Sequence, residues 1–557
     1  MSDKTPPYSS HIFMFPFRFD WNEDGFDREY FFYKEKNITD RIAIRKLHEK
    51  LTQDKDWEYK AFKVADEYNE YSYFYDYARD AIYNFSEEFD EDAISYYYEK
   101  NQFKNEIFEL KIKERKESYQ LTLAGVTLRV FNSGVAILSL ELENHTHLNF
   151  DDILKINDFG RRIYPQFIGK DNGIEDTKDA FLAEYIKIGE IEERFEYENF
   201  DNIRIGSHIM QLLGQTIFTQ DKKQTERYYI RPSLDDRMFV ISWYGNSAKS
   251  TQLKQDYLQN DSWYKYVFVD GKYVTVKNRG MQKELLKNST YDRWSDDGML
   301  FGISRYSFVS ITNRDWFPLN IIQPHIGTMY FQMITLLLAT RSSLLRFSNE
   351  IAVLASHQQI DTQKLTILYQ RYLTFSDRLY FNEVTHQDQG IELYDMARNQ
   401  MKIDEHIEKL NGKFSKLFEF AELQDRKRVE AFEKKKFKIE KEIADKRANA
   451  MDNFTIMGAI FLPPSLMIAL FSMGIFEYEQ SFNSLIIGVI SIVCSALLTI
   501  GILNFKKPIN KKKIISAITI AIATLLFVLI PFRLIGEKTK PNDVNITNPI
   551  IKVEIKK

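Results

Sequence analysis

Hydrophobic and polar positions alternate in several short segments of the first 320 residues, which predicts β-strands. The clearest case is 121–142, where the apolar runs LTLAGVTLRVF and VAILSLEL flank the turn sequence Asn132-Ser133-Gly134 and predict a β-hairpin. Other strands are expected over 11–21, 238–243, 264–269, 273–276 and 298–311. Helices are expected over most of 27–117 and over 150–168, the second opened by Asp151 or Asp152. Residues 1–318 are therefore predicted to form a mixed sensor domain of the α+β or α/β class.

After Pro318 the apolar spacing becomes helical. A buried core helix is expected over 326–339, a second helix over 363–381, and one long helix from 391 to 476. Apolar residues with alternating spacings of four and three form a seam on that long helix, namely Ile403, Ile407, Leu410, Phe414, Leu417 and Ala421. The seam fits either a helix packed on its own domain or an oligomeric stalk. No glycine, proline or loop cluster separates the end of this segment from the apolar run that begins at 454, which favours the stalk, within a helical region over 319–452.

Three runs near the end of the sequence contain no charged residue and no histidine: 454–476, 484–503 and 514–532. Their lengths match the roughly 20 residues that a helix needs to cross a bilayer. They predict a transmembrane region of two to three spans over 453–535, followed by a polar tail over 536–557. The basic stretches 433–447 and 504–513 are expected on the inner side. The predicted localisation is the inner (plasma) membrane, with a cytosolic N-terminal domain and the C-terminus outside.

Charge and cysteine content exclude several classes of protein. The chain carries 75 Lys and Arg against 79 Asp and Glu, and the acidic excess lies before residue 425, so direct binding of a nucleic-acid duplex is not expected. The only cysteine, Cys494, cannot form an intrachain disulfide. No sequence motif of a hydrolase, a metalloprotease or a phosphate-binding loop is present, so no catalytic residues, no enzymatic activity and no resident cofactor are predicted.

The segment that begins at 454 resembles the pore helix of the CorA-type metal-ion transport superfamily. Ile460-Phe461-Leu462-Pro463 is similar to the Ile-Phe-x-Pro stretch of that family, and Ser472-Met473-Gly474 occupies the position of its Gly-Met-Asn tripeptide. Glu477 and Glu479 follow in the short outer loop. The chain departs from the family by having Gly474 in place of the asparagine and by a third apolar run. With the stretch RLYFNEVTHQDQGIELYDMARNQ at 378–400, the layout resembles CorA-like membrane effectors associated with type III CRISPR systems.

This resemblance implies a homo-oligomeric ion channel, pentameric by analogy, that lies in a lipid bilayer and acts in antiviral defence. It also implies gating by a nucleotide second messenger, a conjugate of S-adenosylmethionine and AMP (SAM-AMP), bound by the N-terminal domain. Two alternatives remain open. One is a divalent-cation transporter of the Mg²⁺ type regulated by its own ion, with metal ligands unknown, and the other is a membrane-anchored sensor or scaffold.

Three sets of residues are the candidate sites. Helical spacing places Met451, Thr455, Leu462, Ser465, Ala469 and Ser472 on one pore-lining face, with Gly458 near it. The resemblance adds Met473 and Gly474 to the pore lining through the tripeptide position, and it places Glu477 and Glu479 at the outer mouth. Arginines near aromatic rings suit an anionic nucleotide, and the densest groups are Arg161, Arg162, Arg227, Tyr228, Arg231, Arg237 and Trp243. The oligomer seam is Ile403, Ile407, Leu410, Phe414 and Leu417.

Overall fold

The computed structural model describes residues 6–22, 40–53, 56–62, 69–163, 182–195, 205–234, 237–271, 273–356 and 360–472, together with Ile490, Val493, Cys494, Leu497 and Ile515. The chain divides into two compact units, Met1–Gln424 and Asp425–Lys557. The boundary falls within a long helix and not near residue 318, because the helices that follow residue 318 pack onto the same domain as the sheet.

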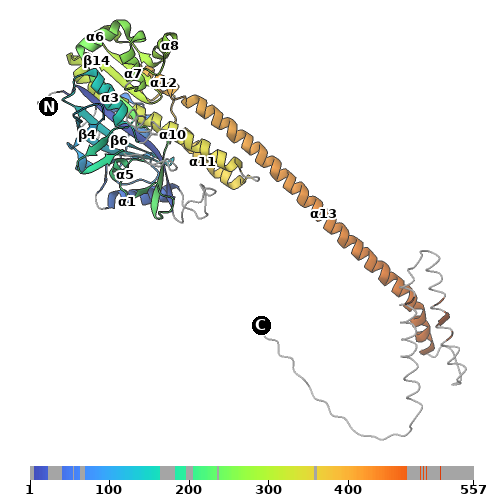
Figure 1. Ribbon diagram of the computed structural model, residues 1–557. Coiled ribbons are helices and arrows are strands. Elements are labelled where there is room, and N and C mark those ends of the chain that lie inside the picture. Colours follow the sequence, from blue (N-terminus) through green and yellow to red (C-terminus); the bar gives the residue numbers. More distant parts are fainter. Residues whose placement is uncertain are drawn as a thin grey trace, which may run out of the picture. The chain divides into compact units, whose positions relative to one another are not determined.

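The first unit is built on a mixed sheet of 14 strands (Figure 1). The path through the sheet runs β12-β13-β14-β11-β1-β6-β5-β4-β7-β8, and β10, β9, β3 and β2 lie off this path. Most neighbours are antiparallel, whereas β11–β14 and β10–β9 are parallel. The strands are β1 (Ser9–Asn22), β2 (Glu58–Tyr59), β3 (Ser95–Glu99), β4 (Ile107–Lys111), β5 (Tyr119–Phe131), β6 (Val135–Asn144), β7 (Tyr185–Ile188), β8 (Ile191–Arg194), β9 (Phe218–Thr219), β10 (Arg227–Pro232), β11 (Phe239–Gly245), β12 (Thr290–Tyr291), β13 (Leu300–Ser304) and β14 (Ser307–Thr312).

Helices cover both faces of the sheet and create two hydrophobic cores. On β1, Phe13, Phe15, Phe17 and Phe19 point into one core, whereas Ile12 and Met14 point into the other. The first core is covered by α1 (Asp40–Thr52), α3 (Phe150–Gly160), α5 (Ser207–Leu213), α6 (Ser247–Asp256), α7 (Asp261–Phe268) and α8 (Arg279–Ser289). The second is covered by α2 (Asp76–Ile82), α10 (Met329–Ser356), α11 (Thr362–Leu379), α12 (Asp388–Gln400) and the start of α13 (Ile403–Ser472), after the short helix α9 (Gln323–Gly327).

Several predicted elements are confirmed. Strands β5 and β6 form the predicted hairpin, with Phe131 opposite Val135 across the Asn132-Ser133-Gly134 turn. Gly134 has a φ of +79°, a conformation that glycine adopts without strain. The predicted core helix is α10, which is buried along most of its length, and α11 matches the helix expected over 363–381.

Other predicted elements are wrong. The strands expected over 264–269 and 273–276 are absent from the described residues, since helix α7 covers 261–268 and Asn260 caps it by accepting hydrogen bonds from the Ser262 and Trp263 amides. A short apolar run fits a buried helix as well as a strand. Residues 27–117 hold only α1 and α2 as α-helices among the described residues, besides strands β2–β4. Helix α3 ends at Gly160 and is capped by Asn149.

The single helix predicted over 391–476 is also interrupted. Helix α12 ends at Gln400, and α13 begins at Ile403 after Lys402, whose φ of +56° is incompatible with a continuous right-handed helix. The first part of α13 packs on its own domain: Leu410 and Phe414 are each 1% exposed in the second core, where Phe414 contacts Tyr369 and Tyr372.

In the structure, the residues of the predicted oligomer seam already pack within one chain. Ile403, Leu410 and Phe414 are buried in the second core. Ile407 and Leu417 are partly buried and pack against the same core. The spacing of four and three residues occurs wherever helices pack side by side, so it did not distinguish an internal contact from one between copies.

No described helix is both long enough and apolar enough to cross a membrane. This finding contradicts the predicted transmembrane region of two to three spans, and with it the multi-pass placement in the inner membrane with the C-terminus outside. The prediction relied on charge-free length alone, which a spanning helix requires but which does not by itself establish one. The runs 484–503 and 514–532 lie almost entirely outside the described residues.

Candidate anion-binding pocket

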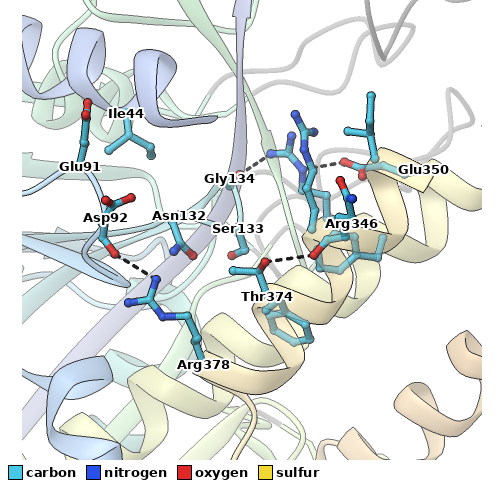
Figure 2. A pocket seen from close by; sticks show the side chains of 15 residues that line it. Ile44, Glu91, Asp92, Asn132, Ser133, Gly134, Arg346, Glu350, Thr374 and Arg378 are labelled. Carbon is cyan, nitrogen blue, oxygen red and sulfur yellow. Dashed lines mark hydrogen bonds and ion pairs between the residues drawn. The ribbon is translucent and has the colours of Figure 1, made fainter. Parts of the chain in front are cut away.

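A pocket of about 450 Å³ lies in the first unit between the β5–β6 turn, the loop before β3, and helices α10 and α11. This volume is within the range of small-molecule sites in proteins. Its lining contains three arginines, Arg346, Arg371 and Arg378. It also contains three carboxylates, Glu91, Asp92 and Glu350. Figure 2 shows Glu91 and Asp92 on the side opposite Arg346 and Glu350. The pocket therefore offers both signs of charge to a ligand.

Arg346 fixes the turn that forms one wall of the pocket. Its Nη1 donates to the carbonyl oxygens of Gly134 at 2.5 Å and Phe19 at 3.1 Å, while Nη2 donates to Asp20 Oδ1 at 2.8 Å. Its Nε donates to Glu350 Oε1 at 2.7 Å (Figure 2). These charge-assisted bonds join the tip of the hairpin, strand β1 and helix α10 into one rigid support.

Glu350 is the buried acid of the site. Only 3% of the residue is exposed, and desolvation raises the pKa of its carboxyl group to about 7, although the neighbouring Arg346 opposes the shift. Near neutral pH this group therefore exists in both protonation states. When it is protonated, it can donate a hydrogen bond, and the arginines then outweigh the remaining carboxylates of the pocket.

Helix α11 contributes a polar face to the opposite wall. Arg371, Thr374 and Arg378 follow at spacings of three and four residues, which places them on one side of the helix. Arg378 Nη1 donates to the backbone carbonyl of Asp92 at 3.0 Å, so this helix is tied to the loop before β3. The side chain of Arg378 remains exposed, and Arg371 is partly exposed. Both guanidinium groups are accessible from solvent.

The predicted ligand residues fall in several places. Arg162 and Arg237 form an isolated backbone bridge, and the carbonyl of Arg161 accepts from the Met238 amide at 2.8 Å, so these three arginines do lie together. Arg161 is buried and donates to the carbonyl of Val269 at 2.9 Å. Arg161, Arg162 and Arg237 do not line the pocket, although they belong to the same domain as the arginines that do.

The other four predicted ligand residues lie apart from that group. Arg231 reaches the support of the pocket, because its Nη2 is 3.5 Å from Asp20 Oδ2. Arg227 donates to the carbonyl of Gln215, Tyr228 is part of the first core, and Trp243 is buried in the second core. The arginines that do line the pocket were missed, because residues more than 200 positions from the hairpin turn complete it. The signal in the sequence was the spacing of Arg371, Thr374 and Arg378, which places all three on one side of α11.

The predicted pore face is only partly described. Met451, Thr455, Gly458, Leu462, Ser465, Ala469 and Ser472 lie on α13, whereas Met473, Gly474, Glu477 and Glu479 lie outside the described residues. The hydroxyl groups of Thr455 and Ser465 each donate to a carbonyl four residues earlier in their own helix. The assignment of this face to a pore depended on the predicted transmembrane region, and no described helix is long and apolar enough to cross a membrane.

Among the residues that the structure describes, no group of three or more His, Cys, Asp or Glu side chains is placed to hold a metal ion. Binding of a divalent cation therefore stays a prediction without a site. No family model, curated protein or solved structure matches the chain.

Proposed function

We propose that residues 1–424 form a sensor domain that binds a small anionic ligand of the nucleotide type in the pocket between the β5–β6 turn and α11. The observation that supports this proposal most directly is the presence of three arginines around one pocket of about 450 Å³. Planar guanidinium groups bind phosphate oxygens with two parallel hydrogen bonds, which lysine cannot match.

The remaining lining gives each part of a nucleotide a partner. Arg371 and Arg378 would bind the phosphate, because both are accessible from solvent. Glu91 and Asp92, on the other side of the pocket, would accept hydrogen bonds from ribose hydroxyls or from a cationic group of the ligand. Ile367, which is 40% exposed, supplies apolar contact for a base. A SAM-AMP conjugate, which the sequence resemblance implies, carries both a phosphate and cationic groups and is the first ligand to test.

Helix α13 provides a physical route for a response. Its first part, from Ile403 to Ala421, belongs to the same core as α10 and α11, which form one side of the pocket. Phe414 of α13 contacts Tyr369 and Tyr372 of α11, the helix that carries the two accessible arginines. A ligand that shifts α11 would therefore change the packing of α13. This coupling is part of the proposal.

The test is isothermal titration calorimetry of the full-length protein with SAM-AMP, AMP, cyclic AMP and ATP. Arg371→Ala and Arg378→Ala are expected to weaken binding by about ten-fold or more each, because each removes hydrogen bonds to a charged group. Lys364→Ala on the same helix is the matched control: it also removes one positive charge, and Lys364 does not line the pocket. The proposal would be refuted if none of these nucleotides binds. It would also be refuted if a variant that combines Arg371→Ala with Arg378→Ala binds as tightly as the unmodified protein.

A further inference from the structure

A second arginine-rich cluster lies where the turn between β13 and β14 meets helix α10. Arg341 of α10 donates from Nη1 to the carbonyl of Arg305 at 3.0 Å. Its guanidinium carbon lies 5.7 Å from the centre of the Tyr306 ring, and that of Arg237 lies 5.1 Å from the same centre. Two guanidinium groups therefore share one aromatic ring.

Arg341 is buried, and the described part of the chain provides no carboxylate that pairs with it. It is 8% exposed, and no described carboxylate forms an ion pair with Arg341 or Arg305. The Nε of Arg341 is buried and has no hydrogen-bond partner in the part of the chain that the structure describes. Desolvation lowers the pKa of Arg341 to about 10; Tyr306 opposes this shift, and repulsion from Arg305 adds to it. A buried charge normally has a partner of opposite sign.

The surroundings of Arg341 are basic. His406, in the first turns of α13, has a pKa lowered by desolvation and then by the charge of Arg341. The acid that raises the pKa of His406 is Glu405, and its carboxylate already binds Lys402 at 3.0 Å and Lys409. An acid from the described part of the chain therefore does not neutralise the cluster. Arg305, Tyr306 and His406 are partly exposed, so solvent reaches its edge.

We infer that Arg305, Tyr306 and Arg341 form a second anion site, which binds a phosphate group. Phosphate oxygens would accept hydrogen bonds from Arg341 Nε and from the Arg305 guanidinium, and the negative charge would compensate the desolvated arginine. The site shares no residue with the pocket, in which Arg346 is bound by Asp20, Gly134 and Glu350. It therefore goes beyond the proposed function. It lies beside His406, at the base of α13.

The experiment measures the thermal unfolding of the full-length protein in increasing inorganic phosphate, with ionic strength held constant by sodium chloride. Phosphate is expected to raise Tm beyond the effect of chloride, because it binds the folded state. Arg305→Ala, at a partly exposed position, is expected to weaken the apparent phosphate affinity about ten-fold or more. Arg279→Ala is the control, since Arg279 is an exposed residue that pairs with Asp261. It should leave the response unchanged.

Arg341→Met separates a ligand site from a purely structural arginine. If the inference is correct, this variant has a higher Tm than the unmodified protein without phosphate, because it removes a buried unpaired charge, and it loses the phosphate response. A lower Tm of this variant without phosphate would show that Arg341 is structural and overturn the inference. The absence of any phosphate response would also overturn the inference. So would a phosphate response that is abolished by Arg371→Ala and retained by Arg305→Ala and Arg341→Met.

Discussion

Replacement of Gly134 by alanine tests the support of the pocket most directly. A Cβ atom on this residue would lie 2.6 Å from Cζ of Arg346, closer than a van der Waals contact allows. The φ of +79° adds a separate cost of about 1–2 kcal/mol for alanine, which unlike glycine carries a Cβ atom. Displacing Arg346 would also weaken its bonds to Asp20 and Glu350, each a charge-assisted hydrogen bond of about 1.5–3 kcal/mol.

If one of those bonds is lost, Gly134→Ala is expected to lower the free energy of unfolding by about 2.5–5 kcal/mol. The assay is urea denaturation of the full-length protein, followed by the fluorescence of its tryptophans. Gly412→Ala is a suitable control, because Gly412 lies inside α13 and, apart from the adjacent backbone of this helix, no described atom lies within 4 Å of the added Cβ. Alanine at that position should stabilise the helix by about 0.5–1 kcal/mol.

A double-mutant cycle with Arg346→Ala separates the steric clash from the backbone cost. In the Arg346→Ala background the clash is removed, so Gly134→Ala should cost only the backbone contribution of about 1–2 kcal/mol. Equal costs of Gly134→Ala in both backgrounds would refute the view that Arg346 packs against the turn. A cost below about 1 kcal/mol in the unmodified background would also refute the backbone contribution.

Three further predictions concern buried groups. Burial raises the pKa of Glu350 from its ordinary value of 4.5 to about 7, so the folded state loses up to about 3 kcal/mol of stability as the pH rises from 4.5 through 7. Glu350→Gln should remove this loss in denaturation curves measured across that pH range. Burial lowers the pKa of His11 to about 4, so its contribution has the opposite sign: stability that is present above pH 6.5 is lost as the pH falls toward 4. An NMR signal assigned to His11 that titrates near pH 6.5 would contradict this prediction. Leu410→Asp should lower the stability of the first unit by at least about 3 kcal/mol, because it places a charge in the second core, and an unchanged Tm with a changed oligomer mass would instead support a seam between copies.

Features set by neighbouring residues could be predicted from the sequence. The β5–β6 hairpin followed from the turn at 132–134 between two alternating runs, since the chemistry of a turn is local. Helix α10 followed from an apolar run too short for a membrane span. The strand predicted at 264–269 failed because α7 begins at a cap, Asn260, that lies outside the apolar run used for the prediction.

The pocket could not be predicted in the same way. Ser133 of the turn and Ser343 of α10 lie 2.7 Å apart between their hydroxyl oxygens, although 210 positions separate them in the sequence. Whether Arg346 binds this turn or solvent depends on the packing of α10 across the sheet, which local patterns do not specify. The backbone bridge between Arg162 and Arg237 has the same origin: each arginine was a candidate ligand residue, and only the fold brings the two together.

Strand β1 has a consequence for how the domain is made. It pairs with β6 along one edge and with β11 and β10 along the other, so its partners extend as far as Gly245 in the sequence. On a ribosome, the four phenylalanines of β1 that enter the first core are synthesised long before those partners. Such non-local pairing slows folding and leaves apolar strand surface exposed to aggregation. Chaperone dependence during synthesis, and slow refolding from denaturant, are the expected results.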